Sequence, residues 1–570
     1  MTTDERSLAT WLASREDAEL AETFALRSVG PMTSWHDFFD AAAGLLDAAS
    51  VDRALTRLPR HALVALAAGS GADQPALTRL ALVAPDGTPY AVVADRVAAA
   101  KAASPEAFEE ATDASAPPHR ADDAAAAAAA ERVLATTGAL ADLLIATQHT
   151  PLARTGAGPV SAVDRKRLIE AGAIATPEEL DDLVQTADAA DLLDSTDREW
   201  TASDEADAWL ESSTTERWAR VVTGLRDTLR PGLRSATGGY EPPETWAQAY
   251  PLDPEWPAEA ARLRRIAVRW GLVTPEGGEL PWTEPLRAGG APDAAALATL
   301  LPAEIDKVYL QADLSAIAPG PLAPALDLRL RRIAVRESRA QASTYRFTTE
   351  SLVSGMTEGE TAASIRSFLA ELSLTGIPQP LEYLITSTAS RHGLVRVRVD
   401  ENGYTAVETG DYAVLGALAV DQSLRPLGLV QDGTALVTRV ERDVVYWSLA
   451  DARYPVVAVD AAGEPESVTR RRRPRRASSA SDAPAYAALI ARLRDTHESD
   501  ADAAWLGREL EQAVRARAVI EVAVRLPDGS ARSFTLEATG LGGGRLRGRD
   551  RGADIERTLP VSSIVNVRPA

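Results

Sequence analysis

The chain has no cysteine among its 570 residues. This absence excludes disulfides, thiolate zinc sites, iron–sulfur clusters and a cysteine nucleophile. Lysine is nearly absent too: Lys101, Lys166 and Lys307 are the only ones, and none follows a glycine as a phosphate-binding P-loop requires. No two of the six histidines have the spacing that would place two metal ligands on one helix face. We therefore predict that the chain is not an enzyme, with no catalytic residue, metal or small-molecule cofactor.

Long apolar runs are also missing. No charge-free apolar stretch reaches the roughly 18 residues that a membrane span needs. The segment from Met1 to Arg15 mixes acids with apolar side chains, unlike the basic and then apolar start of a signal peptide. We expect a cytoplasmic protein, with association to the nucleoid left open, and no membrane partner.

The charge of the chain is strongly negative but unevenly spread. The formal net charge is -22, and residues 1–300 carry 26 basic and 47 acidic side chains. Residues 301–570 carry 34 basic and 35 acidic side chains, so this half is close to neutral. Because binding to phosphates relies on cations, any nucleic-acid surface is expected in the second half. The acidic half fits a solvated face or a surface that meets a basic protein.

One pattern occurs four times: a helical stretch, then two short extended pieces joined by a polar turn. The turns contain Gly, Pro, Asn or Asp, which suits tight connections. The copies span Leu82–Val93, Leu192–Thr201, Gly271–Leu280 and Gly393–Val407. A helix followed by a two-stranded ribbon is the plan of a winged helix, and small packing units without a ligand are the alternative.

These features predict an α+β, multi-domain, mainly helical protein, consistent with a length that suggests roughly three to five domains. The last 55 or so residues show about five short strands of alternating polarity, enough for a small β-barrel. The predicted divisions are a helical or winged-helix-like unit (1–100), an Ala/Pro/acidic linker (101–130), winged-helix-like units (131–235 and 236–304), an α/β domain (305–465), an Arg-rich linker (466–484), and helices with the small barrel (485–570).

Two tempting features have plain structural explanations. Asp204-Glu205-Ala206-Asp207 spells a metal-binding box of one helicase group, but no buried apolar strand precedes it, so we read it as a chance match at the start of a helix. Seven of the eleven tryptophans lie between Trp200 and Trp282, in an acidic region. Base stacking needs exposed aromatics in a basic groove, so we expect these rings to anchor a core.

Three arginine groups remain as candidate DNA-binding sites. Each could also be a solvated charged face, and the first is the strongest candidate because runs of like charge often form interaction tails. The candidate residues are Arg470, Arg471, Arg472, Arg473, Arg475 and Arg476 in the linker; Arg329, Arg332, Arg336 and Arg339, with Arg331, on and after a predicted helix; and Arg545, Arg547 and Arg549, with Arg551, on the terminal barrel.

The stretch from residue 308 to about 430 resembles a known family. It contains Val308-Tyr309-Leu310-Gln311-Ala312-Asp313-Leu314, Ala318-Pro319-Gly320-Pro321-Leu322, Arg336-Glu337-Ser338, Tyr345-Arg346-Phe347, Ile377-Pro378-Gln379-Pro380-Leu381 and Arg391-His392-Gly393. This series is similar to the domain at the N-terminus of XPB-type DNA repair helicases, and the chain resembles bacterial helicase-associated proteins that carry that domain without the motor. The resemblance implies an XPB N-terminal-like α/β domain and an XPB-like helicase as partner.

The terminal barrel resembles the C-terminal part of WYL-type domains. Leu541-Gly542-Gly543-Gly544-Arg545-Leu546 and Arg557-Thr558-Leu559-Pro560-Val561 occur in the matching order, whereas Gly544-Arg545-Leu546 stands near the place of the family's Trp-Tyr-Leu. The resemblance implies a WYL-like β-barrel at residues 485–570, together with the helices that precede it.

The leading hypothesis is a non-catalytic DNA-binding accessory protein that acts with an XPB-like DNA repair helicase and binds DNA without sequence specificity. One alternative is a WYL-type winged-helix transcription regulator, which would read a major groove. The other is a protein–protein adaptor without affinity for DNA.

Overall fold

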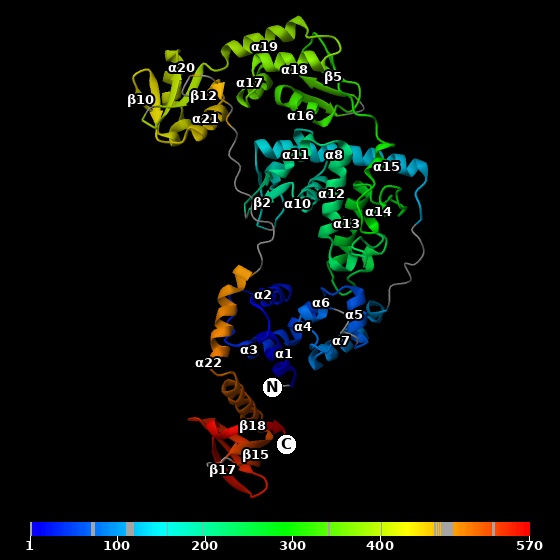
Figure 1. Cartoon of the computed structure of the whole chain (residues 1–570), viewed down its shortest axis with the longest axis vertical. Coiled ribbons are helices and arrows are strands. Elements are labelled where there is room, and N and C mark those ends of the chain that lie inside the picture. Colours follow the sequence, from blue (N-terminus) through cyan, green and yellow to red (C-terminus); the bar gives the residue numbers. More distant parts are fainter. Residues whose placement is uncertain are drawn as a thin grey trace.

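The computed structural model describes residues 3–69, 75–109, 119–156, 158–196, 198–339, 342–400, 402–460, 463, 465–466, 468, 483–526 and 530–569. About half of this part is helical, and four small sheets accompany the helices, which confirms the α+β class. The elements gather into units that follow one another along an elongated molecule (Figure 1).

The N-terminal unit is all helical. Its buried side chains alternate with exposed ones at helical spacing, as Leu8 and Leu12 do on the first helix, so each helix turns one apolar stripe inward. Its elements are α1 (Thr3–Ala13), α2 (Asp17–Leu26), α3 (Phe38–Leu45), α4 (Ala48–Leu55), α5 (Arg60–Ala67), α6 (Pro75–Arg79), α7 (Ala91–Ala103) and the 3-10 turn η2 (Pro105–Phe108).

The middle unit has a single core that extends from Ala126 to Leu297. All seven tryptophans from Trp200 to Trp282 are buried in it, which confirms that these rings anchor a core. Its elements are α8 (Asp123–His149), β1 (Leu152–Ala153), α9 (Ala162–Glu170), α10 (Pro177–Ala189), β2 (Leu193–Ser195), β3 (Glu199–Ala202), α11 (Glu205–Glu211), α12 (Thr214–Thr228), η3 (Pro231–Leu233), η4 (Trp246–Gln248), α13 (Trp256–Arg269), α14 (Glu284–Arg287) and α15 (Ala294–Ala298).

The next unit packs four helices and a four-stranded sheet of order β4-β5-β7-β6 around one core. Its elements are β4 (Tyr309–Leu310), β5 (Ser315–Ala318), α16 (Pro324–Ile333), β6 (Val335–Arg339), β7 (Ser343–Arg346), α17 (Thr349–Thr357), α18 (Ala362–Leu372) and α19 (Gln379–Arg391). The alternation of Leu310, Ala312 and Leu314 in the sequence does not continue as a strand, because β4 ends at Leu310. Leu314 has a φ of 67°, and the Asp313 carboxylate accepts a hydrogen bond from the Ser315 amide, so the chain turns here.

The following unit is a sheet of order β10-β11-β9-β8-β12-β13, in which β12 runs parallel to β8 and the other pairs are antiparallel. Its elements are β8 (Val395–Val399), β9 (Thr405–Thr409), α20 (Tyr412–Val420), η5 (Gln422–Leu427), β10 (Val430–Asp432), β11 (Ala435–Thr438), α21 (Arg442–Asp451), β12 (Val456–Val459) and β13 (Pro465–Glu466). Side chains of β8, β9 and β12 form one core with those of α20 and α21.

The terminal unit is an open sheet of order β17-β16-β15-β14-β18, covered by the end of α22 (Ala483–Ala516). Its strands are β14 (Val519–Arg525), β15 (Ala531–Gly542), β16 (Arg545–Asp550), β17 (Ile555–Pro560) and β18 (Ile564–Pro569), with η6 (Val561–Ser563) before β18. The predicted strands are present, but the predicted barrel is wrong. β17 and β18 are the two edges and do not pair with each other in the described part, and alternating polarity specifies only which face is buried.

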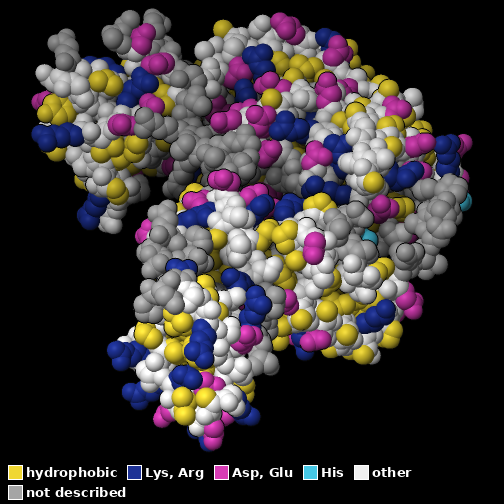
Figure 2. Space-filling model, turned by 60° about the horizontal axis from the view of Figure 1, so that its bottom comes forward, with side chains coloured by type: hydrophobic (Ala, Val, Ile, Leu, Met, Phe, Trp, Pro, Cys, Tyr) yellow, Lys and Arg dark blue, Asp and Glu magenta, His cyan; other side chains and the backbone are white. Residues whose placement is uncertain are grey.

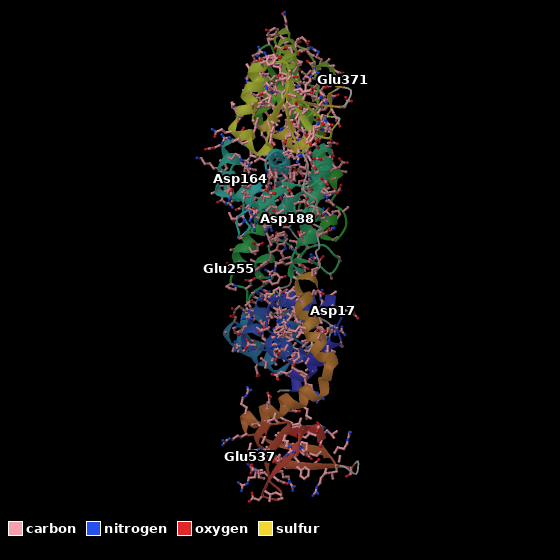
Figure 3. All side chains as sticks on the ribbon, turned by 90° about the vertical axis from the view of Figure 1, so that its left-hand side faces the viewer. Asp17, Asp164, Asp188, Glu255, Glu371 and Glu537 are labelled. Carbon is pink, nitrogen blue, oxygen red and sulfur yellow. The ribbon has the colours of Figure 1, made fainter. Side chains whose placement is uncertain are left out.

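The long helix α22 belongs to two units. Tyr486, Leu489, Ile490 and Leu493 lie in the core of the N-terminal unit, whereas Leu506, Leu510 and Ala513 lie in the core of the terminal sheet. Arg494 also contacts Asp17 at 3.1 Å, and Figure 3 places Asp17 beside α22 and Glu537 on the terminal sheet below it. The two ends of the chain are therefore joined through one helix.

The four predicted repeats each contain antiparallel pairing after a helix. β2 pairs with β3 and β8 pairs with β9, whereas the other two copies have single bridges, Val83 to Pro89 and Val273 to Glu279. The start of α10 is capped, because the Thr176 hydroxyl accepts a hydrogen bond from the Glu179 amide and Pro177 occupies the first turn. Among the described helices, none has the length and apolar character to cross a membrane.

Candidate nucleic-acid interface

The arginine group of the predicted linker, Arg470 to Arg473 with Arg475 and Arg476, lies outside the described residues. Its role in DNA binding therefore stays a prediction. The other two groups are described and differ sharply in how many of their charges are already paired.

Most of the arginines on and after α16 are held by carboxylates. Arg329 makes two hydrogen bonds to the Glu360 carboxylate, at 2.8 and 3.1 Å. Arg331 lies 2.8 Å from the carboxylate of Asp142 on α8, and Arg336 binds the same carboxylate. Guanidinium groups engaged in this way must release a carboxylate before they can bind phosphate, which makes them weak candidates for DNA contact.

The two remaining arginines of this group, Arg332 and Arg339, do not strengthen the case for DNA contact at α16. Arg332 is exposed and interacts electrostatically with Glu360, and the side chain of Arg339 lies outside the described part of the structure. Burial raises the pKa of Glu360, but hydrogen bonds from Arg329 and Ser364 lower it more, so its pKa lies below the ordinary value for glutamate. Glu360 is therefore a lasting partner for Arg329 at neutral pH.

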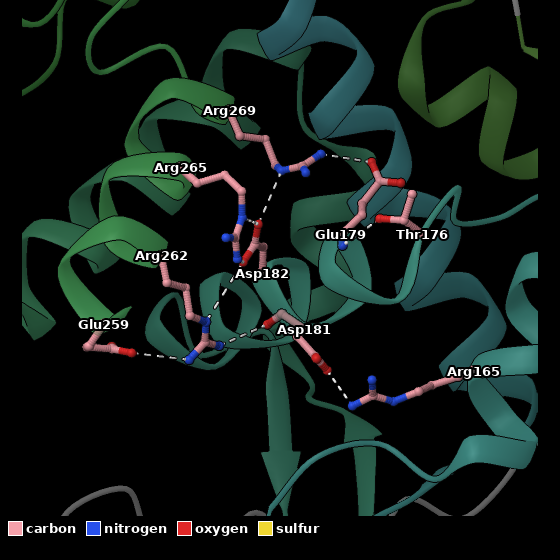
Figure 4. Close-up of polar contacts among 9 residues, drawn as sticks. All are labelled: Arg165, Thr176, Glu179, Asp181, Asp182, Glu259, Arg262, Arg265 and Arg269. Carbon is pink, nitrogen blue, oxygen red and sulfur yellow. Dashed lines mark hydrogen bonds and ion pairs between the residues drawn. The ribbon is translucent and has the colours of Figure 1, made fainter. Parts of the chain in front are cut away.

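The middle unit uses arginines in the same structural way (Figure 4). Three side chains of α13, Arg262, Arg265 and Arg269, converge on Asp182 of α10, which is fully buried. Arg265 makes the closest contacts, two hydrogen bonds at 2.8 and 2.9 Å. The carboxylates of this acidic half thus serve partly to hold arginines between helices.

The terminal sheet presents its arginines differently. Along β16, Leu546, Gly548 and Asp550 are buried, and Arg545, Arg547 and Arg549 alternate with them on the exposed face. Arg549 pairs with Asp554 at 2.8 Å, and Arg551, just after the strand, pairs with Glu537 at 2.9 Å. Within the described part of the chain, the side chains of Arg545 and Arg547 make neither a hydrogen bond nor an ion pair.

The neighbours of these two arginines on β15 are glycines, which leave open space beside the guanidinium groups. Arg545 lies opposite Gly542 and Arg547 opposite Gly540 on β15, and a Cβ atom at either glycine would meet nothing within 4 Å. On the other side, β17 places Pro560 opposite Arg545 and the exposed Thr558 opposite Arg547. We call this exposed face, defined by Arg545, Arg547, Thr558, Gly540 and Gly542, the β16 face.

The buried side of β16 explains why the strand holds this orientation. A Cβ atom at Gly548 would come within 2.9 Å of the Glu537 carbonyl oxygen, so only glycine fits there. Asp550 accepts a hydrogen bond from Arg557 at 2.5 Å, and this bond, helped by the amides of Gly552 and Ala553, lowers the pKa of Asp550. The contacts of Gly548 and Asp550 on the buried face of β16 thus fix the orientation of the strand and keep its arginines on the exposed face.

Charge is distributed unevenly over the molecular surface. In Figure 2 the lower lobe, which carries the terminal sheet, shows more basic than acidic side chains. The β16 face therefore combines unpaired arginines, an open approach and a locally positive surface.

The sequence identifies the arginines of β16, but it does not show which of them have carboxylates as cross-strand neighbours. Arg545 and Arg547 face glycines, whereas Arg549 lies opposite Glu537 and Glu556. Cross-strand neighbours depend on the register, and the sequence does not reveal a bulge such as the one between Ala538 and Gly540. Asp142 was missed as well, because nothing near it in the sequence indicates arginine partners on α16 and β6.

Comparison with known proteins supplies one match. A family model described as a helicase conserved C-terminal domain matches residues 308–432. This stretch begins just before β4 and ends with β10. A search of curated proteins found no match. The chain is therefore helicase-related in this segment, which fits DNA or helicase partners. The match names neither an XPB-type nor a WYL-type domain.

The same match corrects one expectation. The prediction that the chain is not an enzyme is contradicted, because a helicase-family domain points to a protein that would usually be an enzyme. The error lies in the inference: a missing P-loop lysine or histidine pair excludes particular sites and does not exclude catalysis as such.

Proposed function

We propose that this helicase-related protein binds DNA without sequence specificity and that its terminal sheet contacts the phosphate backbone through Arg545 and Arg547. The observation that carries the proposal is the pair of exposed arginines on β16 whose side chains have no partners in the described structure. An arginine fork suits phosphate oxygens, and such contacts position a protein on DNA without reading bases.

The neighbours of Arg545 and Arg547 also favour contact with the phosphate backbone of DNA. Gly540 and Gly542 leave room for a backbone to approach, and the exposed Thr558 hydroxyl can donate to a phosphate oxygen. The face offers no aromatic platform and no row of amide side chains that would read base edges. We infer contact with phosphates alone.

The match at residues 308–432 supports a setting in which DNA is handled by helicase machinery. The resemblance of this stretch to the N-terminal domain of XPB-type helicases makes an XPB-like repair helicase the partner that we propose. The helix-and-hairpin repeats would then act as winged-helix-type units, and the terminal sheet as a WYL-like module. Co-purification of the full chain with the host's XPB-like helicase tests the partnership, and failure of the two purified proteins to associate would contradict it.

The DNA-binding experiment compares two double variants of the full chain. Arg545→Ser with Arg547→Ser removes the two unpaired charges, and Arg549→Ser with Arg551→Ser removes two paired charges from the same region. Binding to labelled duplex, forked and single-stranded DNA is measured over a range of salt concentrations.

We expect the first variant to bind roughly tenfold more weakly, with a salt slope lower by about two, since each phosphate bound adds about 0.9 to the slope. The second variant should change both quantities much less. Equal reductions in the two variants would mean that net charge alone matters, and a wild-type chain that binds none of these DNAs would refute the proposal.

A further inference from the structure

A second surface with the properties of a DNA interface lies on α19. The helix buries Leu381, Ile385 and Thr388 on one face. The opposite face exposes Gln379, Tyr383, Thr386 and Ser390, Arg391 is exposed at the end of the helix, and Tyr383 is 74% exposed. Figure 1 shows α19 at the top of its unit.

The exposed face of α19 carries hydrogen-bonding groups and no free acid. Its one carboxylate, Glu382, accepts a hydrogen bond from Arg366 at 2.6 Å, and Arg366 also donates to the Thr386 hydroxyl at 2.9 Å. A polyanion could therefore approach this face without meeting charge repulsion from it.

Three arginines border the end of this helix. Arg391 is its last residue, Arg396 lies on β8, and Arg453 precedes β12. The backbone brings them together: the amides of Gly393 and Val395 both donate to the Pro455 carbonyl oxygen, and β8 runs parallel to β12 from Val395 and Val456 onward.

These arginines differ from most others in the two units. Arg391, Arg396 and Arg453 are exposed, and none of their side chains makes a hydrogen bond or ion pair within the described structure. By contrast, Arg346 pairs with Glu337, and Arg398 with Glu408. Glu408 lies opposite Arg396 in the sheet, but it pairs with Arg398, whose Nε and Nη2 both donate to its Oε1 atom, at 3.0 and 2.6 Å.

We propose that α19 and these three arginines form a second nucleic-acid surface that takes duplex DNA. The exposed face of α19 enters the major groove, and Arg391, Arg396 and Arg453 bind phosphates beside it. This inference rests on the proposed DNA-binding function but concerns a surface separate from the β16 face.

The chemistry of the surface favours a duplex over a single strand. The major groove admits an α-helix, and glutamine, serine, threonine and tyrosine side chains such as those of this face can hydrogen-bond to the phosphate oxygens beside it without reading bases. Binding of a single strand uses several aromatic rings along a basic groove, whereas Tyr383 is the one aromatic residue on this face. The three arginines lie at one end of the helix, where they would meet the backbone that flanks the groove.

The test uses the full chain and two triple variants that each remove three positive charges. One combines Arg391→Ser, Arg396→Ser and Arg453→Ser. The control combines Arg53→Ser, Lys101→Ser and Arg198→Ser, which are exposed cations of the first two units whose side chains make no hydrogen bond or ion pair in the described structure. Thermal unfolding of each variant is measured first, because only variants that unfold at the wild-type temperature are compared.

We expect the first triple variant to bind duplex DNA at least roughly tenfold more weakly, with a salt slope lower by about three. Its affinity for a single strand of equal length should stay within about twofold, because the β16 face remains intact. The double variant Gln379→Ala with Tyr383→Ala should also bind duplex more weakly, but with an unchanged salt slope, since uncharged groups release no counterions. Duplex binding equal to that of the control triple variant would overturn the inference.

Measuring the β16 double variant beside these variants separates the two proposals. If the β16 variant binds more weakly and the α19 variant does not, the proposed function stands and the second surface is refuted. If the α19 variant binds more weakly and the β16 variant does not, DNA is bound through α19 and the role of the β16 face is refuted.

Discussion

The carboxylate of Asp142 lies 2.8 Å from the guanidinium of Arg331, and this ion pair connects α8 of the middle unit to α16 of the next unit. Asp142 is 6% exposed and Arg331 15%, so both charges are largely withdrawn from water. Arg336 binds the same carboxylate, and the Tyr345 hydroxyl donates to nearby Asp327 at 2.5 Å. Arginines that look like a DNA-binding group in the sequence thus serve to hold two units together.

Asp142→Asn should weaken this connection, because Arg331 and Arg336 would lose their nearest anionic partner and keep the more distant Asp327, at 3.7 and 3.8 Å. Removal of one member of a buried pair typically costs about 3–5 kcal/mol, and the residual exposure of these arginines suggests about 2–4 kcal/mol here. Thermal unfolding and limited proteolysis between the two units provide the measurement. Glu131→Gln, on an exposed position of the same helix, is the matched control, and equal behaviour of the two variants would contradict the role given to Asp142.

The stability of the unit that contains Glu360 should depend on pH. The pKa of Glu360 is lower in the folded chain than its ordinary value, so the stabilisation is complete above the unfolded-state pKa of about 4.3 and is lost as the pH falls through the folded-state value. Arg329→Gln should reduce stability by about 1 kcal/mol at neutral pH, since this arginine is 38% exposed. The difference between wild type and variant should shrink at acid pH. A difference that stays constant from pH 7 to pH 3 in denaturant titrations would show that the pair does not contribute through the charge of Glu360.

The sequence was informative where a pattern depends on near neighbours. The alternation of Arg545, Leu546, Arg547 and Gly548 predicts a strand with arginines on one face, and the structure has that strand. The burial of the tryptophans between Trp200 and Trp282 also followed from local charge. Such features need only the period of the chain and the character of adjacent residues.

The sequence failed where charges meet across the fold. Arg331 and Arg336 look like free cations until Asp142, far away in the chain, is placed beside them. The gathering of Arg391 and Arg453 depends on the parallel pairing of β8 with β12, which no local pattern encodes. The open terminal sheet has the same cause, since strand periodicity cannot tell whether two edges meet.

The dual role of α22 predicts that two substitutions on one helix act on different units. Leu489 is fully buried in the core of the N-terminal unit, and Leu510 is fully buried under the terminal sheet. Each Leu→Ala change should cost about 2–5 kcal/mol. Hydrogen exchange should show Leu489→Ala loosening α1 to α5, with β14 to β18 little affected, and Leu510→Ala doing the reverse. The same pattern of loosening in both variants would show that the two units unfold as one.

The arginine-rich segment offers a last prediction, drawn from its sequence alone. Replacing Arg470, Arg471, Arg472, Arg473, Arg475 and Arg476 by serine should weaken DNA binding to a similar degree for unrelated sequences, because a run of cations neutralises phosphates without reading bases. The salt slope should fall by about one for each phosphate that the variant no longer binds. Replacement of the same six residues by lysine is the matched control. Lysine keeps the charge but not the planar fork, so an affinity equal to that of the wild type would indicate counterion release, and a weaker one would indicate guanidinium geometry. Unchanged affinity and slope in the serine variant would remove this segment from the binding surface and leave the β16 face and α19 as the candidates.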